Sequence, residues 1–133
     1  MFDTSRFQER LNTTIIRPEL IIKEEADSTN EIAKDLLRDG ATEGLIVIAD
    51  AQTHGSGRRG RSWESPIGGL YMSLVLEPRG IGAPYSAYSL LAGCGAAVAL
   101  KKTTGLEVKL KWPNDLYVRS KKLGGILTEL VVE

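Results

Sequence analysis

The chain has 133 residues, of which 42% are hydrophobic and 26% charged, an ordinary composition for one globular domain or for part of a larger one. Because 17 Lys and Arg residues balance 17 Asp and Glu residues, the sequence does not have the basic excess typical of nucleic-acid-binding proteins. A single cysteine excludes an internal disulfide, and the longest apolar stretch, residues 90–100, is too short to span a membrane. We therefore expect a cytoplasmic protein that binds neither nucleic acid nor membranes.

The N-terminal part predicts a polar segment followed by a strand and a helix. Residues 1–19 are polar and allow a short helix over residues 4–13. Residues 20–23 are typical of a short strand. Several potential N-cap residues then occupy positions 27–30, and apolar residues recur at helical spacing until Gly40, a residue type that commonly ends a helix.

The central part predicts two strands, separated by a flexible glycine-rich loop, and then a long helix. The β-branched run at residues 45–49 is typical of a strand that is buried on both faces. The loop spans residues 52–63, and residues 70–76 predict the next strand. Pro84 suits the first position of a helix, and the pattern predicts that this helix extends over residues 84–103.

The long helix has an apolar face and two glycines. The face is formed by Ala87, Leu91, Cys94 and Val98. We expect it to pack in the core, with Cys94 contributing packing rather than chemistry. Gly93 and Gly95 lower the helix propensity, so we interpret both as points of close backbone approach.

The C-terminal part predicts three strands. Residues 108–112 alternate with period two, and residues 113–115 turn the chain. Residues 116–118 and 126–132 predict a hairpin joined by residues 119–122. The order of strands and helices along the chain indicates a mixed α+β or α/β fold.

The last predicted strand is unusual because residues 126–132 are apolar enough for the centre of a sheet, yet the chain ends there. A central strand needs neighbours on both sides, and an uncovered edge invites pairing with another chain. We therefore expect that the chain is shorter than its domain, or that a second chain completes the sheet.

The glycine-rich loop contains three arginines and ends in Trp63. Its glycines match G-x-G-x-x-G after a strand, but residues 62–69 cannot form the helix that a dinucleotide-binding fingerprint requires. Glycines let backbone N–H groups approach an anion, and arginine makes bidentate contacts with phosphate or carboxylate. The loop is therefore either a site for a small anionic ligand or a solvated basic loop with Trp63 in the core.

A second polar stretch combines residues 111–115 with residues 122–126. Its lysines and Asp115 are either exposed strand and turn residues or ligands for phosphate and Mg²⁺. Gly124 and Gly125 would let a ligand lie close to the backbone. The stretch is a candidate site, with both interpretations open.

Three further polar residues have simpler interpretations. Ser28 and Thr29 are either helix caps or ligand contacts. His54 has no nucleophile or metal-ligand partner at a useful spacing, so we assign it no catalytic role.

Four segments, residues 27–30, 52–63, 111–115 and 122–127, together resemble the catalytic domain of biotin protein ligases. They occur in the family's order, and the resemblance covers about residues 20–133. It implies the fold of class II synthetase-like biotin and lipoate ligases, a mixed α+β fold with helices packed on a largely antiparallel sheet.

The resemblance also implies a reaction in two steps. The biotin carboxylate attacks the α-phosphate of Mg-ATP, which gives biotinyl-5′-AMP and pyrophosphate. A lysine amine of a biotin carboxyl carrier domain then takes the biotinyl group, and the enzyme is expected to be a homodimer. The alternatives are a non-catalytic biotin-binding fragment, half of a split ligase, or a relative of the lipoate ligases.

The resemblance assigns roles to individual residues. The biotin contacts are Ser28, Thr29, Gln52, Gly55, Arg58, Lys122 and Gly125. The nucleotide contacts are Arg58, Arg61, Trp63, Lys111, Asn114 and Asp115. Lys122 and Arg58 are the catalytic candidates, and Asp115 is a weak candidate ligand for Mg²⁺.

The sequence departs from the family in two places. Ser56 stands where the family often has a basic residue, which is expected to weaken phosphate binding or alter closure of the loop. The family's catalytic domain also continues past the end of this chain, so we expect an incomplete nucleotide site.

Overall fold

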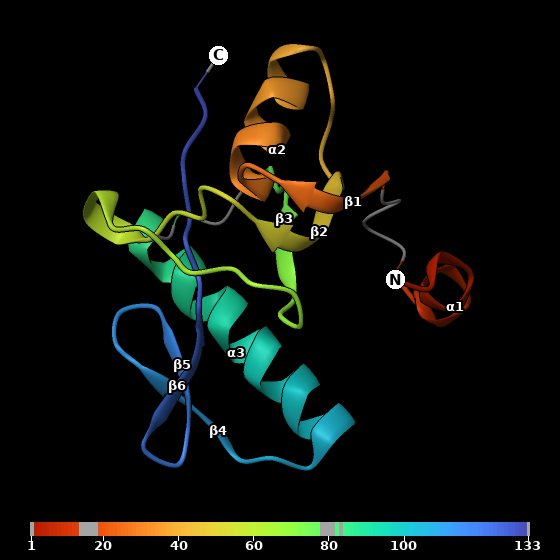
Figure 1. The fold of residues 1–133 in the computed structure, drawn as a ribbon. Helices are drawn as coiled ribbons and strands as arrows, with labels where there is room; N and C mark the ends of the chain where they lie inside the picture. The colour runs from red at the N-terminus through yellow and green to blue at the C-terminus, as the bar shows by residue number, and fades with distance from the viewer. Residues whose placement is uncertain (1, 14–18, 78–81, 83, 133) are drawn as a thin grey trace. The chain divides into compact units, whose positions relative to one another are not determined.

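The computed structural model describes residues 2–13, 19–77, 82 and 84–132, and the chain forms two compact units, Met1–Arg79 and Gly80–Glu133 (Figure 1). The first unit begins with helix α1, Thr4–Arg10, which is three residues shorter than predicted. The Asp3 carboxylate caps this helix, because its Oδ1 accepts a hydrogen bond from the Arg6 backbone N–H at 3.0 Å.

A three-stranded sheet forms the centre of the first unit. Its strands are β1 (Leu20–Ala26), β2 (Ile46–Gln52) and β3 (Tyr71–Leu74), with β2 in the middle. Strand β2 pairs parallel with β1 and antiparallel with β3, so that Ile48 lies opposite both Ile22 and Met72. The residues of β2 from Ile46 to Ala49 are buried, which confirms the prediction of a strand covered on both faces.

Helix α2, Thr29–Arg38, connects β1 to β2 and packs on this sheet (Figure 1). Its Ala33 joins Leu45 and Val47 in a buried cluster, and the partly buried residues around it are Ile21, Ile32, Leu36, Ala41 and Val75. Gly40 follows the helix with φ of +97°, a conformation that L-residues with side chains rarely adopt. The predicted helix and its glycine stop are therefore confirmed.

The second unit begins with helix α3, Tyr85–Thr104, for which Pro84 is the N-cap residue rather than the first helical residue. A Cβ at Gly93 would lie 3.0 Å from Leu110 Cδ2, which confirms the predicted close approach there. The same prediction is wrong for Gly95, since among the described residues no atom outside its immediate neighbours and the helix's own backbone lies within 4 Å of its Cβ position.

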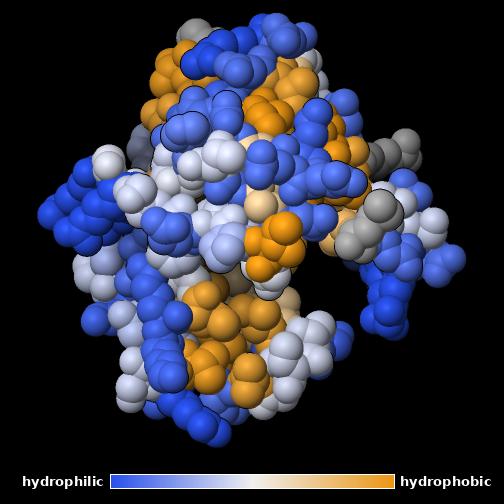
Figure 2. All heavy atoms as spheres, viewed as in Figure 1, coloured by the Kyte–Doolittle hydropathy of each residue, from blue (hydrophilic) through white to orange (hydrophobic). Residues whose placement is uncertain are grey.

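The predicted apolar core face of α3 is also wrong. Leu91 and Val98 are 55% and 68% exposed, and Cys94 is exposed rather than packed. Apolar residues are spread all round this Ala- and Gly-rich helix, so its sequence does not single out one face. Apolar side chains are visible at the surface in Figure 2, low in the view where Figure 1 has α3.

An antiparallel sheet of three short strands completes the second unit. Its strands are β4 (Val108–Lys111), β5 (Asp115–Val118) and β6 (Lys121–Gly125), in that spatial order. A turn that contains the cis Trp112–Pro113 bond joins β4 to β5, as the sequence predicts a turn there.

The prediction that residues 126–132 pair with β5 is wrong, because β5 pairs with residues 121–125. Residues 126–132 lie in the described part of the chain and belong to no strand there. The chain reverses within the two-residue turn of Arg119 and Ser120, in which Arg119 has φ of +55°. Lys122 therefore lies in the ladder rather than in a connecting loop. The expectation of a second chain assumed that residues 126–132 form a central strand. Since they form no strand in this structure, that argument no longer applies.

The order of elements after α1 is strand, helix, strand, strand, helix and three strands, as predicted, so the mixed α+β class is confirmed. Within the described ranges, the structure has no helix whose length and apolar character would suit a membrane span.

Candidate functional site

The glycine-rich loop after β2 carries backbone hydrogen bonds and a short helical turn of its own. The Trp63 N–H donates to the Gly55 carbonyl and the Gly57 N–H donates to the Arg61 carbonyl, both at 2.7 Å. A 3₁₀ turn, Arg58–Gly60, forms its tip. These bonds fold the loop back on itself, so that its side chains are displayed from a defined backbone.

Gly55 is the glycine that the loop requires. It is buried, and a Cβ at this position would lie 2.5 Å from both the Trp63 carbonyl oxygen and Ser65 Oγ. By contrast, the Cβ position of Gly57 has no neighbour closer than 3.4 Å. The close backbone approach at Gly55 therefore depends on the absence of a side chain.

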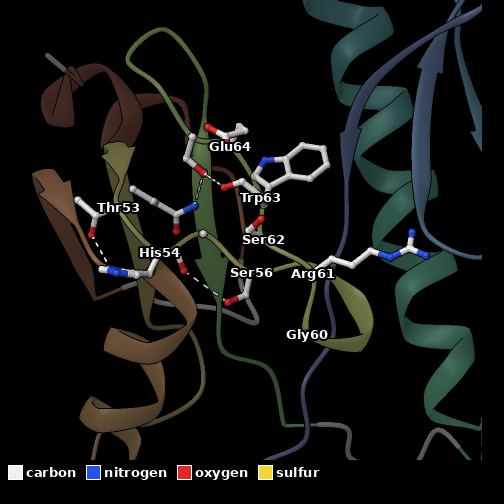
Figure 3. A pocket seen from close by; sticks show the side chains of 11 residues that line it. Thr53, His54, Ser56, Gly60, Arg61, Ser62, Trp63 and Glu64 are labelled. Atoms are coloured by element: carbon white, nitrogen blue, oxygen red, sulfur yellow. Dashed lines mark hydrogen bonds between the residues drawn. The ribbon is translucent and has the colours of Figure 1, made fainter.

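Gln52 joins the start of α2 to this loop. Its Oε1 accepts hydrogen bonds from the Thr29 N–H at 2.8 Å and from Thr29 Oγ1 at 3.2 Å. Its Nε2 donates to Ser65 Oγ at 3.0 Å, and the Ser65 hydroxyl donates to the Trp63 carbonyl at 3.1 Å. Three segments that are distant in the sequence thus share one hydrogen-bond network, part of which is drawn in Figure 3.

Sequence reasoning missed two serines of this network. Ser65 and Ser73 are 5% and 8% exposed, and Ser73 Oγ lies 2.8 Å from Thr29 Oγ1 while also contacting Asn30 Oδ1. Ser73 has one usable signal, because a polar residue in an apolar strand pattern indicates a hydrogen-bonded interior position. Ser65 lies in an irregular segment and has none.

A shallow pocket lies beside this network, lined among others by Gln52, Gly55, Arg61, Trp63 and Ser65. In Figure 3 the Trp63 and Arg61 side chains project to one side of the loop, and Thr53 and His54 lie on the other. Trp63 is half-buried, while Arg58 and Arg61 are exposed. The two arginines therefore do not pack in the core, and their guanidinium groups are accessible from solution.

We expect Gln52→Ala to lower the free energy of unfolding by about 1–3 kcal/mol, because it leaves the buried Thr29 N–H without its acceptor. Urea denaturation measures this loss. Gln8→Ala, at an exposed position of α1, is the matched control. Equal stability of the two variants would contradict a structural role for the Gln52 network.

Asp27, Thr53 and His54 form an exposed cluster at the base of the loop. Thr53 Oγ1 donates to Asp27 Oδ1 at 2.7 Å, and His54 Nδ1 lies 3.5 Å from the same oxygen. The hydrogen bond from Thr53 and, next, the one from His54 hold the pKa of Asp27 below its ordinary value of 3.8. The cluster fastens the start of the loop to the segment that carries Ser28.

This shift predicts a pH dependence. Since the folded-state pKa of Asp27 is depressed, its contribution to stability is present above pH 3.8 and is lost as the pH falls through the folded-state pKa. We expect the free energy of unfolding of Thr53→Val to fall less steeply at acid pH than that of the unmodified chain, as measured by urea denaturation between about pH 2 and 6. An unchanged acid limb would show that the Thr53 hydrogen bond does not affect folding.

The second unit carries its own polar cluster on the β4–β6 sheet. Lys122 Nζ lies 2.7 Å from Asp115 Oδ1, with exposed side-chain fractions of 37% and 21%. Asn114 holds the neighbouring turn in place through two hydrogen bonds to Ile126, both of 2.9 Å. Its side-chain Nδ2 donates to the Ile126 carbonyl, and its backbone carbonyl accepts from the Ile126 N–H. The Asn114 side chain therefore has a structural role in addition to any ligand contact.

Gly125 lies beside this ion pair, and a Cβ there would be 3.5 Å from Asp115 Oδ1. Lys111 Nζ lies over the Tyr117 ring, 5.1 Å from its centroid. Among the described residues, no group of three or more His, Cys, Asp or Glu side chains is arranged to hold a metal ion. The carboxylate of Asp115 is instead paired with the Lys122 ammonium group.

The predicted site residues divide between the two units. The first unit holds Ser28, Thr29, Gln52, Gly55, Arg58, Arg61 and Trp63, and the second holds Lys111, Asn114, Asp115, Lys122 and Gly125. The structure brings Thr29, Gln52 and Gly55 together around Ser65, and it brings Asp115, Lys122 and Gly125 together on one sheet.

The fold is similar to that of biotin protein ligases of known structure. The enzyme from Aquifex aeolicus in complex with biotin and ATP matches with a TM-score of 0.75 and 40% identity, over 84% of this chain and 47% of that one. The biotin acetyl coenzyme A carboxylase synthetase from Helicobacter pylori matches with a TM-score of 0.74 and 29% identity. The match covers 86% of this chain and 56% of that one.

The model of the biotin/lipoate A/B protein ligase family matches residues 23–133, and the chain belongs to this family. The bifunctional ligase/repressor BirA of Bacillus spizizenii is 37% identical over 124 residues, which are 92% of this chain and 38% of that protein. A biotin--[acetyl-CoA-carboxylase] ligase of Paracoccus denitrificans is 38% identical over 77% of this chain and 43% of its own length. The chain thus spans less than half the length of these relatives, and the family resemblance noted in the sequence is confirmed.

Proposed function

We propose that this chain carries the biotin site and part of the nucleotide site of a ligase that activates biotin with ATP and transfers it to a protein lysine. The observation that carries the proposal is the Lys122–Asp115 pair beside Lys111 on the β4–β6 sheet, in a chain of the biotin/lipoate ligase family. We expect the acceptor to be a carboxyl carrier domain and the location to be the cytoplasm.

The first unit is proposed to bind biotin. Ser28 is 3% exposed, and its hydroxyl makes no capping hydrogen bond in the described part of the chain, which leaves it available to a ligand. The ureido group of biotin offers both donors and an acceptor, which Ser28 and the Thr29–Gln52 pair would complement. Gly55 would let the ligand approach the loop, and Arg58 would hold the biotin carboxylate.

The second unit is proposed to bind the nucleotide phosphates. The ammonium group of Lys122 would bridge the biotin carboxylate and the α-phosphate, and Lys111 and Asn114 would contact the rest of ATP. Asp115 would hold Mg²⁺, which supplies neutralisation of phosphate charge when it is bound. In the first unit, Arg61 would add a phosphate contact and the Trp63 indole a wall for the adenine.

No step of this reaction needs a protein nucleophile. The biotin carboxylate attacks the α-phosphorus, the bond to the pyrophosphate leaving group breaks, and the carrier amine later displaces AMP from the acyl carbon. The protein contributes positioning of the reactants and neutralisation of their negative charge. Arginine and lysine side chains are suited to both tasks at neutral pH.

Mass spectrometry of an apo carrier domain incubated with this chain, biotin and Mg-ATP tests the proposal, with pyrophosphate release followed in parallel. We expect a biotin adduct on the carrier and matching pyrophosphate. Biotin binding without pyrophosphate release would favour the alternative of a non-catalytic fragment or half of a split ligase. Displacement of biotin by lipoate would favour the lipoate branch of the family.

The assembly is proposed to be a homodimer. Size-exclusion chromatography with light scattering, at several protein concentrations, tests this expectation. A mass that stays that of one chain throughout would contradict it.

A further inference from the structure

We infer that Tyr117 is a positioning residue that holds the Lys111 ammonium group away from Asp115. The expected effect of Tyr117 on ATP binding rests on the proposed function, in which Lys111 contacts ATP. Tyr117 itself is not among the residues that the sequence or the resemblance singled out. Its contact with Lys111 is the starting observation, with Lys111 Nζ 5.1 Å from the ring centroid.

Strand register places five charged or aromatic side chains on one face of the β4–β6 sheet. Lys109 pairs with Tyr117 and Lys111 pairs with Asp115 across the β4–β5 ladder, while Lys122 pairs with Tyr117 across β5–β6. Residues directly opposite in an antiparallel ladder share a face, as do residues two apart along a strand. Tyr117 is therefore flanked by lysines from both neighbouring strands.

The same register gives two lysines access to one carboxylate. Lys111 lies directly opposite Asp115, and Lys122 reaches Asp115 from β6, at 2.7 Å. Within the described part of the chain, the Lys111 ammonium nevertheless lies over the Tyr117 ring and not on that carboxylate. A long side chain reaches the diagonal neighbour across an antiparallel pair, so this placement fits the ladder geometry.

The ring resolves the competition between the two lysines. The negative face of an aromatic ring attracts an ammonium group that lies within about 6 Å of the centroid. Lys111 is thereby drawn one diagonal step from Asp115, and Asp115 is left to orient Lys122. Without the ring, Lys111 is expected to share Asp115, which would disturb the placement of both ammonium groups.

Nuclear magnetic resonance of the full chain tests the contact independently of activity. An ammonium-bearing side chain over a ring experiences an upfield ring-current shift, so the Lys111 Cε methylene, assigned through Lys111→Gln, is expected to be upfield in the unmodified chain. Tyr117→Leu should abolish this shift, and Tyr117→Phe should retain it because the ring remains. A Lys111 shift that is the same in all three proteins would overturn the inference.

Titration with Mg-ATP tests the consequence. We expect Tyr117→Leu to weaken ATP affinity by about two- to five-fold and Tyr117→Phe to leave it unchanged. In a Lys111→Gln background, Tyr117→Leu should have no further effect, whereas in a Lys109→Gln background it should keep its effect. Persistence of the Tyr117→Leu effect without Lys111 would overturn the inference. Absence of ATP binding by the unmodified chain would contradict the proposed function, and the ring-current shift would still decide the positioning role.

Discussion

Replacing Lys122 by alanine is expected to lower the rate of biotinyl-5′-AMP formation by about 10²–10³-fold, the loss typical of removing one charge-stabilising group from an active site. The side chain is only partly buried and pairs with Asp115 on a short sheet, so the fold should survive its removal. Pyrophosphate release measures the rate, and circular dichroism with thermal unfolding checks the fold.

Lys121→Ala is the matched control. Lys121 precedes Lys122 on the same strand and pairs with Val118, so its side chain lies on the opposite face of the sheet. It carries the same charge, and its removal should leave the rate close to that of the unmodified chain. Equal rates for the two variants would contradict the catalytic role of Lys122. In the same way, an Arg58→Ala variant that forms the adenylate at the unmodified rate would contradict the catalytic role of Arg58.

Replacing Gly55 by alanine is expected to disrupt the loop and lower the free energy of unfolding by about 1–3 kcal/mol or more. The added Cβ would meet the Trp63 carbonyl oxygen, a backbone atom that cannot rotate away, at 2.5 Å. Ser65 Oγ at the same distance and Gln52 Nε2 at 3.1 Å would also be displaced, so the Gln52 network should be lost together with biotin binding. Calorimetry measures both the stability and the affinity.

Gly57→Ala is the control for Gly55→Ala, because Gly57 has an extended backbone with φ of −114° and its nearest neighbour would be 3.4 Å from the new Cβ. We expect this variant to keep most of its stability and affinity for biotin. If both glycines tolerate alanine equally, the close approach at Gly55 is not a requirement of the site.

The residues of the candidate site differ in how far the sequence alone could single them out. The loop arginines and Lys122 were singled out by residue type and by the resemblance to biotin protein ligases. Ser65 and Tyr117 were not, because their significance lies in their partners, Gln52 and Lys111. The sequence does not show these contacts, because only the fold brings the two partners together.

The sequence by itself determined the order and type of the elements, from α2 with its stop at Gly40 to the turn after β4. These features depend on residues close together in the chain: apolar periodicity, capping residues and turn-forming glycine and proline. The resemblance of its four motifs likewise needed no coordinates, and the match to the biotin/lipoate A/B protein ligase family confirms it.

Only the tertiary structure decided which segment completes the β5 hairpin and which side of α3 is covered. Residues 126–132 have the stronger strand composition, yet a two-residue turn brings residues 121–125 into the ladder first. Leu91 and Val98 look like core residues but are exposed, while Gly93 makes the close contact. Which segments pair and which side chains are buried depends on the free energies of several competing arrangements. These free energies come from contacts between residues distant in the chain, which local sequence patterns do not reveal.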